Sequence, residues 1–289
     1  MKLFKTYTLL SLLWLNPLQE TLGQSHVEVT KFETTYLPSQ ELPGGLYHTQ
    51  FDVLLPIVVD QSSVIITGFN IDNLFTTQTT HTQATATALK LGVVVTHSEK
   101  LKGTYVALPK KTWGSHYSKN RELQLGSLLL WKLSLDSGVK IKSGLYSNNE
   151  QFGWFMVPLL GFELRKGRYE INATLPMMAN ASYDLGSQFQ IGANFTANRS
   201  TFAMSDKTKS YLEKNLKHIG VFVQKDLGNF RFFTNASIGL NNRVEIYPSD
   251  QKTQIVVSPI TSNDKRQPQS VHTFQPYSFK CGVKYRIAV

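Results

Sequence analysis

Hydrophobic and polar residues alternate in one segment after another along the chain, which is the pattern of a β-strand with one apolar and one polar face. The clearest case is residues 277–289, where apolar or aromatic side chains hold the odd positions and mainly polar, basic or small ones the even positions. The same alternation recurs over residues 123–135, 139–145, 169–175, 189–197 and 230–241. Because a tilted strand of about 9–11 residues crosses a bilayer, the longer segments predict transmembrane strands.

The connections between these segments are of two kinds, and the two kinds take turns along the chain. Short polar or glycine-containing turns are predicted at 60–62, 99–102, 136–138, 166–167, 186–187 and 227–228. Longer connections are predicted at 37–46, 73–83, 110–121, 147–154, 200–215 and 248–270, with a short one at 177–178 after Pro176. The fold class predicted is therefore all-β: a transmembrane up-and-down antiparallel β-barrel of about 14 strands, with 12 as the alternative. Short turns and both termini are expected on the periplasmic side, and longer loops outside the cell.

The first residues have the features of a signal peptide. Lys2 and Lys5 precede a short apolar run at 7–15, and Thr21 and Gly23 offer small residues before a cleavage site. The apolar run is too short for a membrane-spanning helix, which needs about 20 residues. The prediction is a signal peptide at 1–23, a barrel domain at 24–289, and export to the bacterial outer membrane.

Several short motifs extend the argument from fold to family. They are Tyr36-Leu37-Pro38, the segment at 51–57, the segment at 125–129, and the block PLLGFELRKGRYEINATLPMMANASYD at 158–184. On these motifs the chain from about Tyr36 onward resembles an uncharacterised outer-membrane β-barrel family of Bacteroidota (domain of unknown function 6268). The resemblance implies a barrel in the outer membrane, with outer-membrane lipids and the barrel assembly machinery as partners. It departs from the usual barrel ending, an aromatic residue, because this chain ends in Val289.

Composition and charge narrow the functions that such a barrel could have. The formal net charge is +10, but the basic residues are scattered and the chain is expected to be exported, so a nucleic-acid partner is not expected. The polar strand faces are predicted to line the lumen, with these residues as candidates: Lys132, Lys140, Lys142, Glu170, Arg231, Lys284 and Arg286. Two interpretations stay open: a network of paired charges that fills the barrel, or a pore or pocket for anionic solutes.

The same alternation predicts where the aromatic residues and the single cysteine lie relative to the membrane. Interfacial aromatic girdles are expected from Tyr47, Tyr105, Trp131, Trp154, Tyr169, Tyr183, Tyr247 and Tyr277. Cys281 falls in the apolar register of the last strand and is expected to face lipid. With one cysteine, the chain can form no intramolecular disulfide.

No residue pattern points to catalysis, and neither a metal nor a cofactor is expected. The nearest pairs are His97-Ser98 and Ser115-His116, but adjacent residues on a strand point to opposite faces and make poor nucleophile–base partners. The prediction is therefore a non-enzymatic outer-membrane barrel, either a pore or a transporter for small solutes. A barrel-type lipid hydrolase, a structural outer-membrane protein and a secreted glycan-binding β-sandwich are the alternatives, and the oligomeric state is not predicted.

Overall fold

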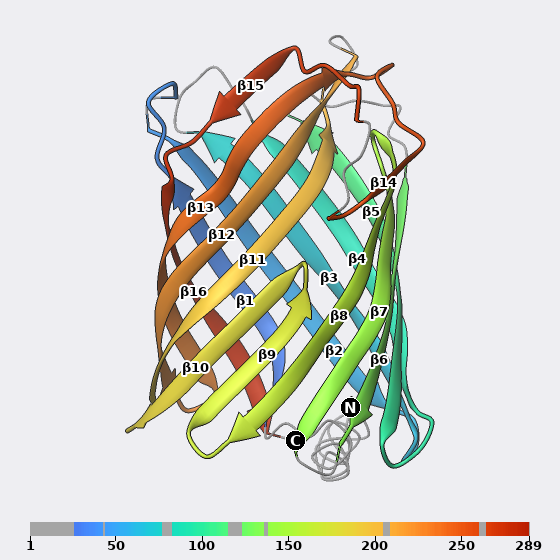
Figure 1. Ribbon diagram of the computed structural model, residues 1–289, viewed down its shortest axis with the longest axis vertical. Helices are drawn as coiled ribbons and strands as arrows, with labels where there is room; N and C mark the ends of the chain where they lie inside the picture. The colour runs from blue at the N-terminus through green and yellow to red at the C-terminus, as the bar shows by residue number, and fades with distance from the viewer. Residues whose placement is uncertain are drawn as a thin grey trace, which may run out of the picture.

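The chain forms one continuous antiparallel sheet that curls and closes on itself (Figure 1). The computed structural model describes residues 26–42, 44–76, 83–114, 123–135, 138–204, 209–259 and 264–288. The predicted signal peptide at 1–23 lies outside these ranges. None of the described residues forms a helix long and apolar enough to cross a bilayer.

Fourteen strands make the barrel wall, as the alternation predicted. They are β1 (His26–Leu37), β2 (Leu46–Val58), β3 (Ser63–Thr76), β4 (Ala84–Thr96), β5 (Leu101–Gly114), β6 (Gln124–Ser134), β7 (Val139–Glu150), β8 (Gly153–Lys166), β9 (Tyr169–Leu175), β10 (Met178–Gly186), β11 (Phe189–Ala203), β12 (Ser210–Leu227), β13 (Phe230–Pro248) and β16 (Tyr277–Ala288). Each wall strand pairs with its neighbour in sequence, and β1 pairs with β16 to close the ring, from His26↔Ala288 to Tyr36↔Phe279.

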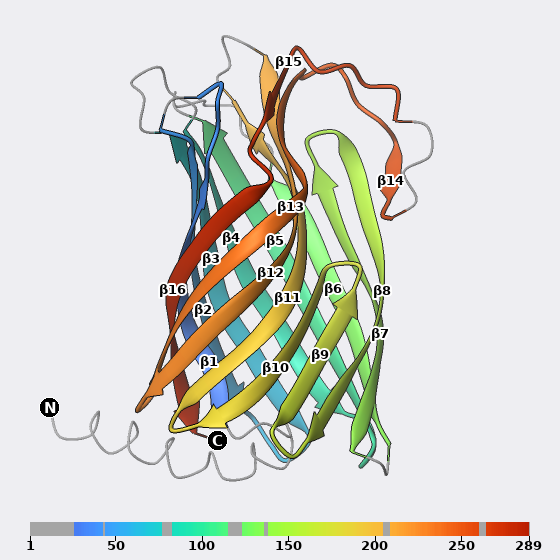
Figure 2. The ribbon, with the colours of Figure 1, turned by 60° about the vertical axis from the view of Figure 1, so that its left-hand side comes forward.

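Two short strands lie in the connection between β13 and β16, which was predicted as one loop at 248–270. Strand β15 (Ser270–Thr273) pairs with the upper end of β13, just ahead of β16. Strand β14 (Ile255–Val257) instead pairs in parallel with β8, on the other side of the barrel. The connection therefore reaches across the outer end of the wall rather than standing clear of it (Figure 2).

The predicted short turns at 60–62, 99–102, 166–167, 186–187 and 227–228 are confirmed at the lower end of Figure 1, where β1 begins and β16 ends. Residues 136 and 137 of the predicted turn at 136–138 lie outside the described residues. Two of the predicted long connections are wrong. Strand β7 continues to Glu150 and β8 starts at Gly153, so 147–154 is mostly strand. Likewise β11 runs to Ala203 and β12 starts at Ser210, so most of 200–215 is strand as well.

The outer face of the wall is apolar. Exposed large apolar side chains occur around the ring, among them Leu160 at 68% and Val221 at 64% exposure, and Cys281 is also exposed. An even strand number, short turns at one end and an outward apolar surface together are the architecture of an outer-membrane β-barrel. The predicted girdle fails at Tyr247, which is buried and stacks on Tyr211 with ring centroids 5.4 Å apart.

Candidate functional site: an inward-folded wall, a strap and an interior cavity

The upper ends of β11 and β12 leave the cylinder and fold into the lumen. Along their lower parts, one face of each strand is exposed, as expected for a wall in lipid. Above, side chains of both faces are buried: Thr201 and Phe202 on β11 are 0% exposed, and Leu212 and Glu213 on β12 are 0% and 1% exposed. Because alternate residues point to opposite faces, burial of neighbours means that protein covers both sides of these strand ends.

One face of this inward-folded segment packs on strands β1 to β4. Its apolar part is a buried cluster of Leu37, Leu46, Leu74, Ala84, Ala86, Phe202, Leu212, Leu216, Val244 and Phe274. A buried charged group lies beside it: Nζ of Lys214 is 2.7 Å from Oδ2 of Asp72 and 2.9 Å from Nε2 of His48. Burying these charges is tolerable because each one is paired.

The upper edge of β11 has its backbone donors satisfied by side chains from β7 and β5. The backbone N–H of Thr201 donates to Oε2 of Glu150 at 2.9 Å, and that of Ala203 donates to Oγ1 of Thr112 at 2.9 Å. Lys110 of β5 binds both carboxylate oxygens of Glu150, at 2.9 and 3.0 Å. Residues from opposite walls thus meet and fill the upper lumen, with Glu150 at the junction.

The connection at 249–259 and 264–269, which we call the strap, covers the outer side of the inward-folded segment. Arg266 holds it there, donating to Oε2 of Glu213 at 2.9 Å and to Oη of Tyr211 at 2.7 Å. The Arg266 guanidinium also lies 4.5 Å from the ring centroids of both Phe152 and Tyr247. Hydrogen bonds from Arg266 lower the pKa of Asp264, against the opposing effect of its partial burial.

The other end of the strap lies against the edge of β8. Three residue pairs, from Ile255↔Trp154 to Val257↔Met156, form the parallel ladder of β14 and β8. Gly153 makes the approach possible, because a Cβ there would lie 1.9 Å from the carbonyl oxygen of Thr253. Its φ of +129° is also a conformation that favours glycine.

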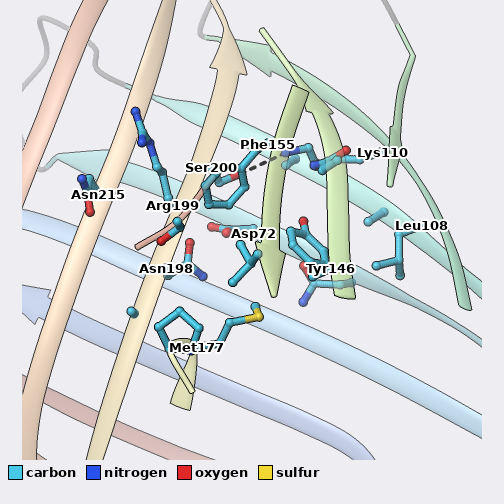
Figure 3. Close-up of a pocket in the computed structure, with 18 of the residues that line it drawn as sticks. Asp72, Leu108, Lys110, Tyr146, Phe155, Met177, Asn198, Arg199, Ser200 and Asn215 are labelled. Atoms are coloured by element: carbon cyan, nitrogen blue, oxygen red, sulfur yellow. Dashed lines mark hydrogen bonds between the residues drawn. The ribbon is translucent and has the colours of Figure 1, made fainter. Parts of the chain in front are cut away.

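A cavity of about 460 Å³ lies beneath the inward-folded segment (Figure 3). Charged side chains of the β2–β5 wall line it on one side, including Asp52, Asp72, Lys90 and Lys110. The strands and connections beyond this wall contribute a mostly apolar lining: Tyr146, Phe155, Val157, Pro176, Met177, Ser258 and Pro259. Such a half-charged, half-apolar enclosure is suited to a small ligand with distinct polar and apolar parts.

A second interior cavity of about 460 Å³, near the short turns, gathers four of the predicted lumen residues. Glu170, Arg231, Lys284 and Arg286 all line it. Acidic partners neutralise the basic ones. Arg231 and Arg286 both bind Asp226, with shortest distances of 2.6 and 2.9 Å, Lys284 lies 2.8 Å from Glu28, and Glu170 is paired with Arg165 at 3.1 Å.

The other three predicted residues lie around Glu163 of β8, away from that cavity's lining. Lys132 and Lys142 approach its Oε1 at 2.9 and 2.8 Å, and Lys140 is its register partner across β7 and β8. The candidate lumen charges are thus interleaved with carboxylates rather than forming a bare basic lining. Their part in any solute pathway stays a prediction.

The residues of the inward-folded segment were missed because most of them lie within 200–215, which was predicted as a loop. A signal was present, since Arg199 shares a strand face with Ile191 and Ala193, which would face lipid. A charge in a lipid-facing register is costly, so Arg199 marks where the wall stops facing lipid. In the structure its Nε donates to Oε1 of Glu213 at 2.7 Å.

Among the described residues, the pair His97-Ser98 has no acidic or amide side chain hydrogen-bonded to it that would complete a catalytic triad. Nε2 of His97 lies 3.0 Å from Oη of Tyr105 at the short-turn end, and Ser115 and His116 lie outside the described residues. Among the residues that are described, no cluster of three or more His, Cys, Asp or Glu side chains is arranged to hold a metal ion.

No protein-family model and no curated protein matches the chain. Among solved structures, it is similar to the translocator domain of the autotransporter NalP from Neisseria meningitidis, with 11% identity over 91% of this chain and 88% of that one, and a TM-score of 0.32. The β domain of the Bordetella autotransporter BrkA matches with 7% identity over 91% and 99% of the two chains and a TM-score of 0.29. The outer-membrane protease OmpT from Escherichia coli matches with 10% identity over 91% and 95%, and a TM-score of 0.22. At such low scores the fold assignment rests on the strand pairing described above.

Proposed function

We propose that this protein is a bacterial outer-membrane β-barrel that binds a small solute and passes it through a gated interior, rather than an open pore. The observation that carries the proposal is the inward-folded segment above a cavity. Packed side chains occupy the upper lumen, whereas polar cavities occupy its middle and lower parts. The signal peptide predicted at 1–23 and the apolar outer surface support the outer-membrane location.

Several of the polar contacts that hold the segment inward meet at one carboxylate, which supports gating. Glu150 accepts hydrogen bonds from Lys110, from Asn148 and from both the backbone N–H and the hydroxyl of Thr201. Loss of Glu150 leaves Thr201 without its acceptor on β7, although the bond from Ala203 to Thr112 remains. Glu150 is therefore a position where one substitution removes several of these contacts together.

The proposal includes no enzymatic step. A hydroxyl nucleophile needs an adjacent base that is free to take its proton. The nearest arrangement is Ser200 with Lys110, at 3.1 Å, but Lys110 donates to both carboxylate oxygens of Glu150 and is not free to act as that base. Hydrolysis of a fluorescent phospholipid by the purified, folded barrel would contradict this part of the proposal.

Planar-bilayer recording of the Glu150→Ala variant tests the gate. We expect the wild type to be silent or to open rarely, and the variant to show frequent discrete openings, because its upper lumen is no longer held closed. Glu163→Ala is the matched control, since Glu163 is likewise ion-paired, with Lys132 and Lys142, but lies outside the inward-folded segment. It should record as the wild type does.

Two results would contradict gating: steady conductance of the wild type, or a silent Glu150→Ala variant that is folded by heat-modifiable gel migration. The second result would favour the structural role. If Glu150→Ala does not fold, Thr201→Val removes one hydroxyl donor to Glu150 at nearly constant volume and takes its place.

A further inference from the structure

The barrel wall contains a seam between β8 and β11. The ladder between β8 and β9 has its uppermost pair at Leu160↔Leu175. The ladder between β10 and β11 has its uppermost pair at Met178↔Thr196. Above these positions the short β9–β10 hairpin has ended, as Figure 2 shows. Among the described strands, none bridges β8 to β11 at that height, so the wall there lacks a continuous backbone ladder.

The strap is what closes the seam, and it is attached differently on its two sides. On the β8 side it forms the three-pair ladder of β14. On the other side it is held to β11 and β12 by side chains of Arg266, Asp264 and Tyr211. Short ladders and side-chain contacts separate more easily than a full strand pairing, because fewer hydrogen bonds break together.

The interior cavity continues through this seam. Asn198 and Ser200 line it from one face of β11, and Ala197 and Arg199 line it from the other face. Because alternate residues of a strand point to opposite sides, the cavity passes around the upper edge of β11. Lys217 and Asn241 line its outer part, and Met177 lies at the lower border in Figure 3.

The lining changes in chemistry along this route. Near the seam it is apolar, with Phe155, Val157 and Met177. Its charged residues are the acids Asp52 and Asp72 and the bases Lys90, Lys110, Arg199 and Lys217. Lys90, Lys110 and Arg199 are ion-paired with Asp52, Glu150 and Glu213, so Lys217, which has no acidic partner among the described residues, is the base that favours an anionic ligand.

We propose that the ligand is a single-chain anionic amphiphile, such as a long-chain carboxylate, and that it moves between the bilayer and the cavity through the seam when the strap is displaced. This rests on the proposed function, whose solute and route it specifies. The apolar chain then leaves lipid directly for the apolar side of the cavity, without crossing water. The carboxylate contacts Lys217 on the way.

A reversible disulfide across β14 and β8 tests the route. Trp154 and Ile255 are register partners with outward, exposed side chains, and neighbouring strands are spaced within disulfide range. In a Cys281→Ser background, W154C/I255C locks the strap when oxidised and frees it when reduced. Dansyl-labelled undecanoic acid in phosphatidylcholine vesicles is the probe, and its emission rises as it enters the cavity.

We expect oxidation to slow probe uptake by roughly tenfold or more, and reduction to restore the rate of the Cys281→Ser parent. The matched control is I191C/V223C in the same background, a register pair on the outward face of β11 and β12 below the seam. Oxidation of that pair should leave the uptake rate unchanged. Equal uptake by the oxidised and reduced strap variant would overturn the route.

Lys217→Gln tests the anionic head group. We expect the affinity for the carboxylate probe to fall by roughly fivefold to tenfold, while that for its methyl ester stays the same. Equal affinities of wild type and variant for the carboxylate would overturn the assignment of charge. If Glu150→Ala conducts ions but neither the wild type nor the variants bind the probe, the amphiphile inference fails and the gated barrel stands. If the wild type binds the probe but Glu150→Ala is silent, the proposed gate fails.

Discussion

One face of strands β11 and β12 is exposed in the lower half of the barrel and covered by protein in the upper half. Near the short turns this face presents Ile191 and Val221, both exposed and apolar. Near the loops the same face presents Arg199 and Glu213, which are ion-paired at 2.6 Å and covered by the strap. The alternation of inward and outward residues is uninterrupted, so it is the surroundings of the face that change, from lipid to protein interior.

The ion pairs of the upper and lower halves also differ in how far they are buried. In the upper half, Lys214 is 0% exposed and depends on Asp72 for its partner. In the lower half, the side chains of Lys284 and Glu28 are 26% and 38% exposed. A buried charge that loses its partner is strongly destabilising, whereas a solvated pair contributes little. The upper half should therefore respond far more to single substitutions.

Removal of the buried lysine gives the largest expected effect. Lys214→Met should lower the free energy of unfolding by about 3–5 kcal/mol, because Asp72 stays buried without its cation. Its counterpart Lys284→Met should cost about 1 kcal/mol or less. Urea unfolding in detergent micelles, followed by tryptophan fluorescence, measures both; equal costs would contradict the contrast between the two halves.

A charge placed on the lower, lipid-facing part of the same strands ranks second. Val221→Arg should cost about 2–4 kcal/mol if Val221 faces the bilayer near its midplane. Lys217→Arg, four residues along the same face, should be close to neutral. Folding into lipid vesicles at graded urea concentrations gives both values, and a neutral Val221→Arg would show that this face does not contact lipid.

Loosening the strap should have a smaller effect on stability and a larger one on local exposure. Gly153→Ala forces a side chain into the space of the Thr253 carbonyl and into an unfavourable φ, at a cost of about 1–3 kcal/mol. A cysteine at Val256, in a Cys281→Ser background, should then react faster with a maleimide. Gly167→Ala, where a Cβ would meet nothing within 4 Å, is the control for a positive φ alone.

Acidification should release the strap, and this is the smallest of the four effects predicted here. The pKa of Asp264 is lower in the folded protein than its ordinary value of 3.8. Its stabilising contribution is therefore complete above that ordinary value and is lost as the pH falls through the folded pKa. Maleimide reaction at Val256→Cys, after a brief acid pulse, should rise below about pH 4, and Asp264→Asn should remove most of that rise.

Much of the wall was predictable because its determinants are local. Alternation and turn chemistry gave the strand number, the antiparallel order and the short turns, since each depends on residues close in sequence. The connection at 147–154 was predicted to be too long because Ser147 to Asn149 are polar and resemble a loop. They are strand residues, of which Asn148 is buried in the protein interior and Asn149 is exposed on the opposite face.

The inward-folded segment and the strap could not be predicted in the same way, because their partners are distant in sequence. Thr201 meets Glu150, and Ile255 pairs with Trp154. Periodicity places a side chain on a face but does not say what covers that face. The predicted lumen residues show the same limit, since alternation selected Arg231 and Arg286 but not their shared partner Asp226.

The pairing of β1 with β16 has a consequence for biogenesis. His26 and Ala288, which lie at opposite ends of the described chain, are register partners. The ring therefore cannot close while the chain is still being delivered, and until β16 arrives both β1 and β13 present open edges that can pair with other chains. An escort that covers these open edges is therefore expected while the sheet is unclosed.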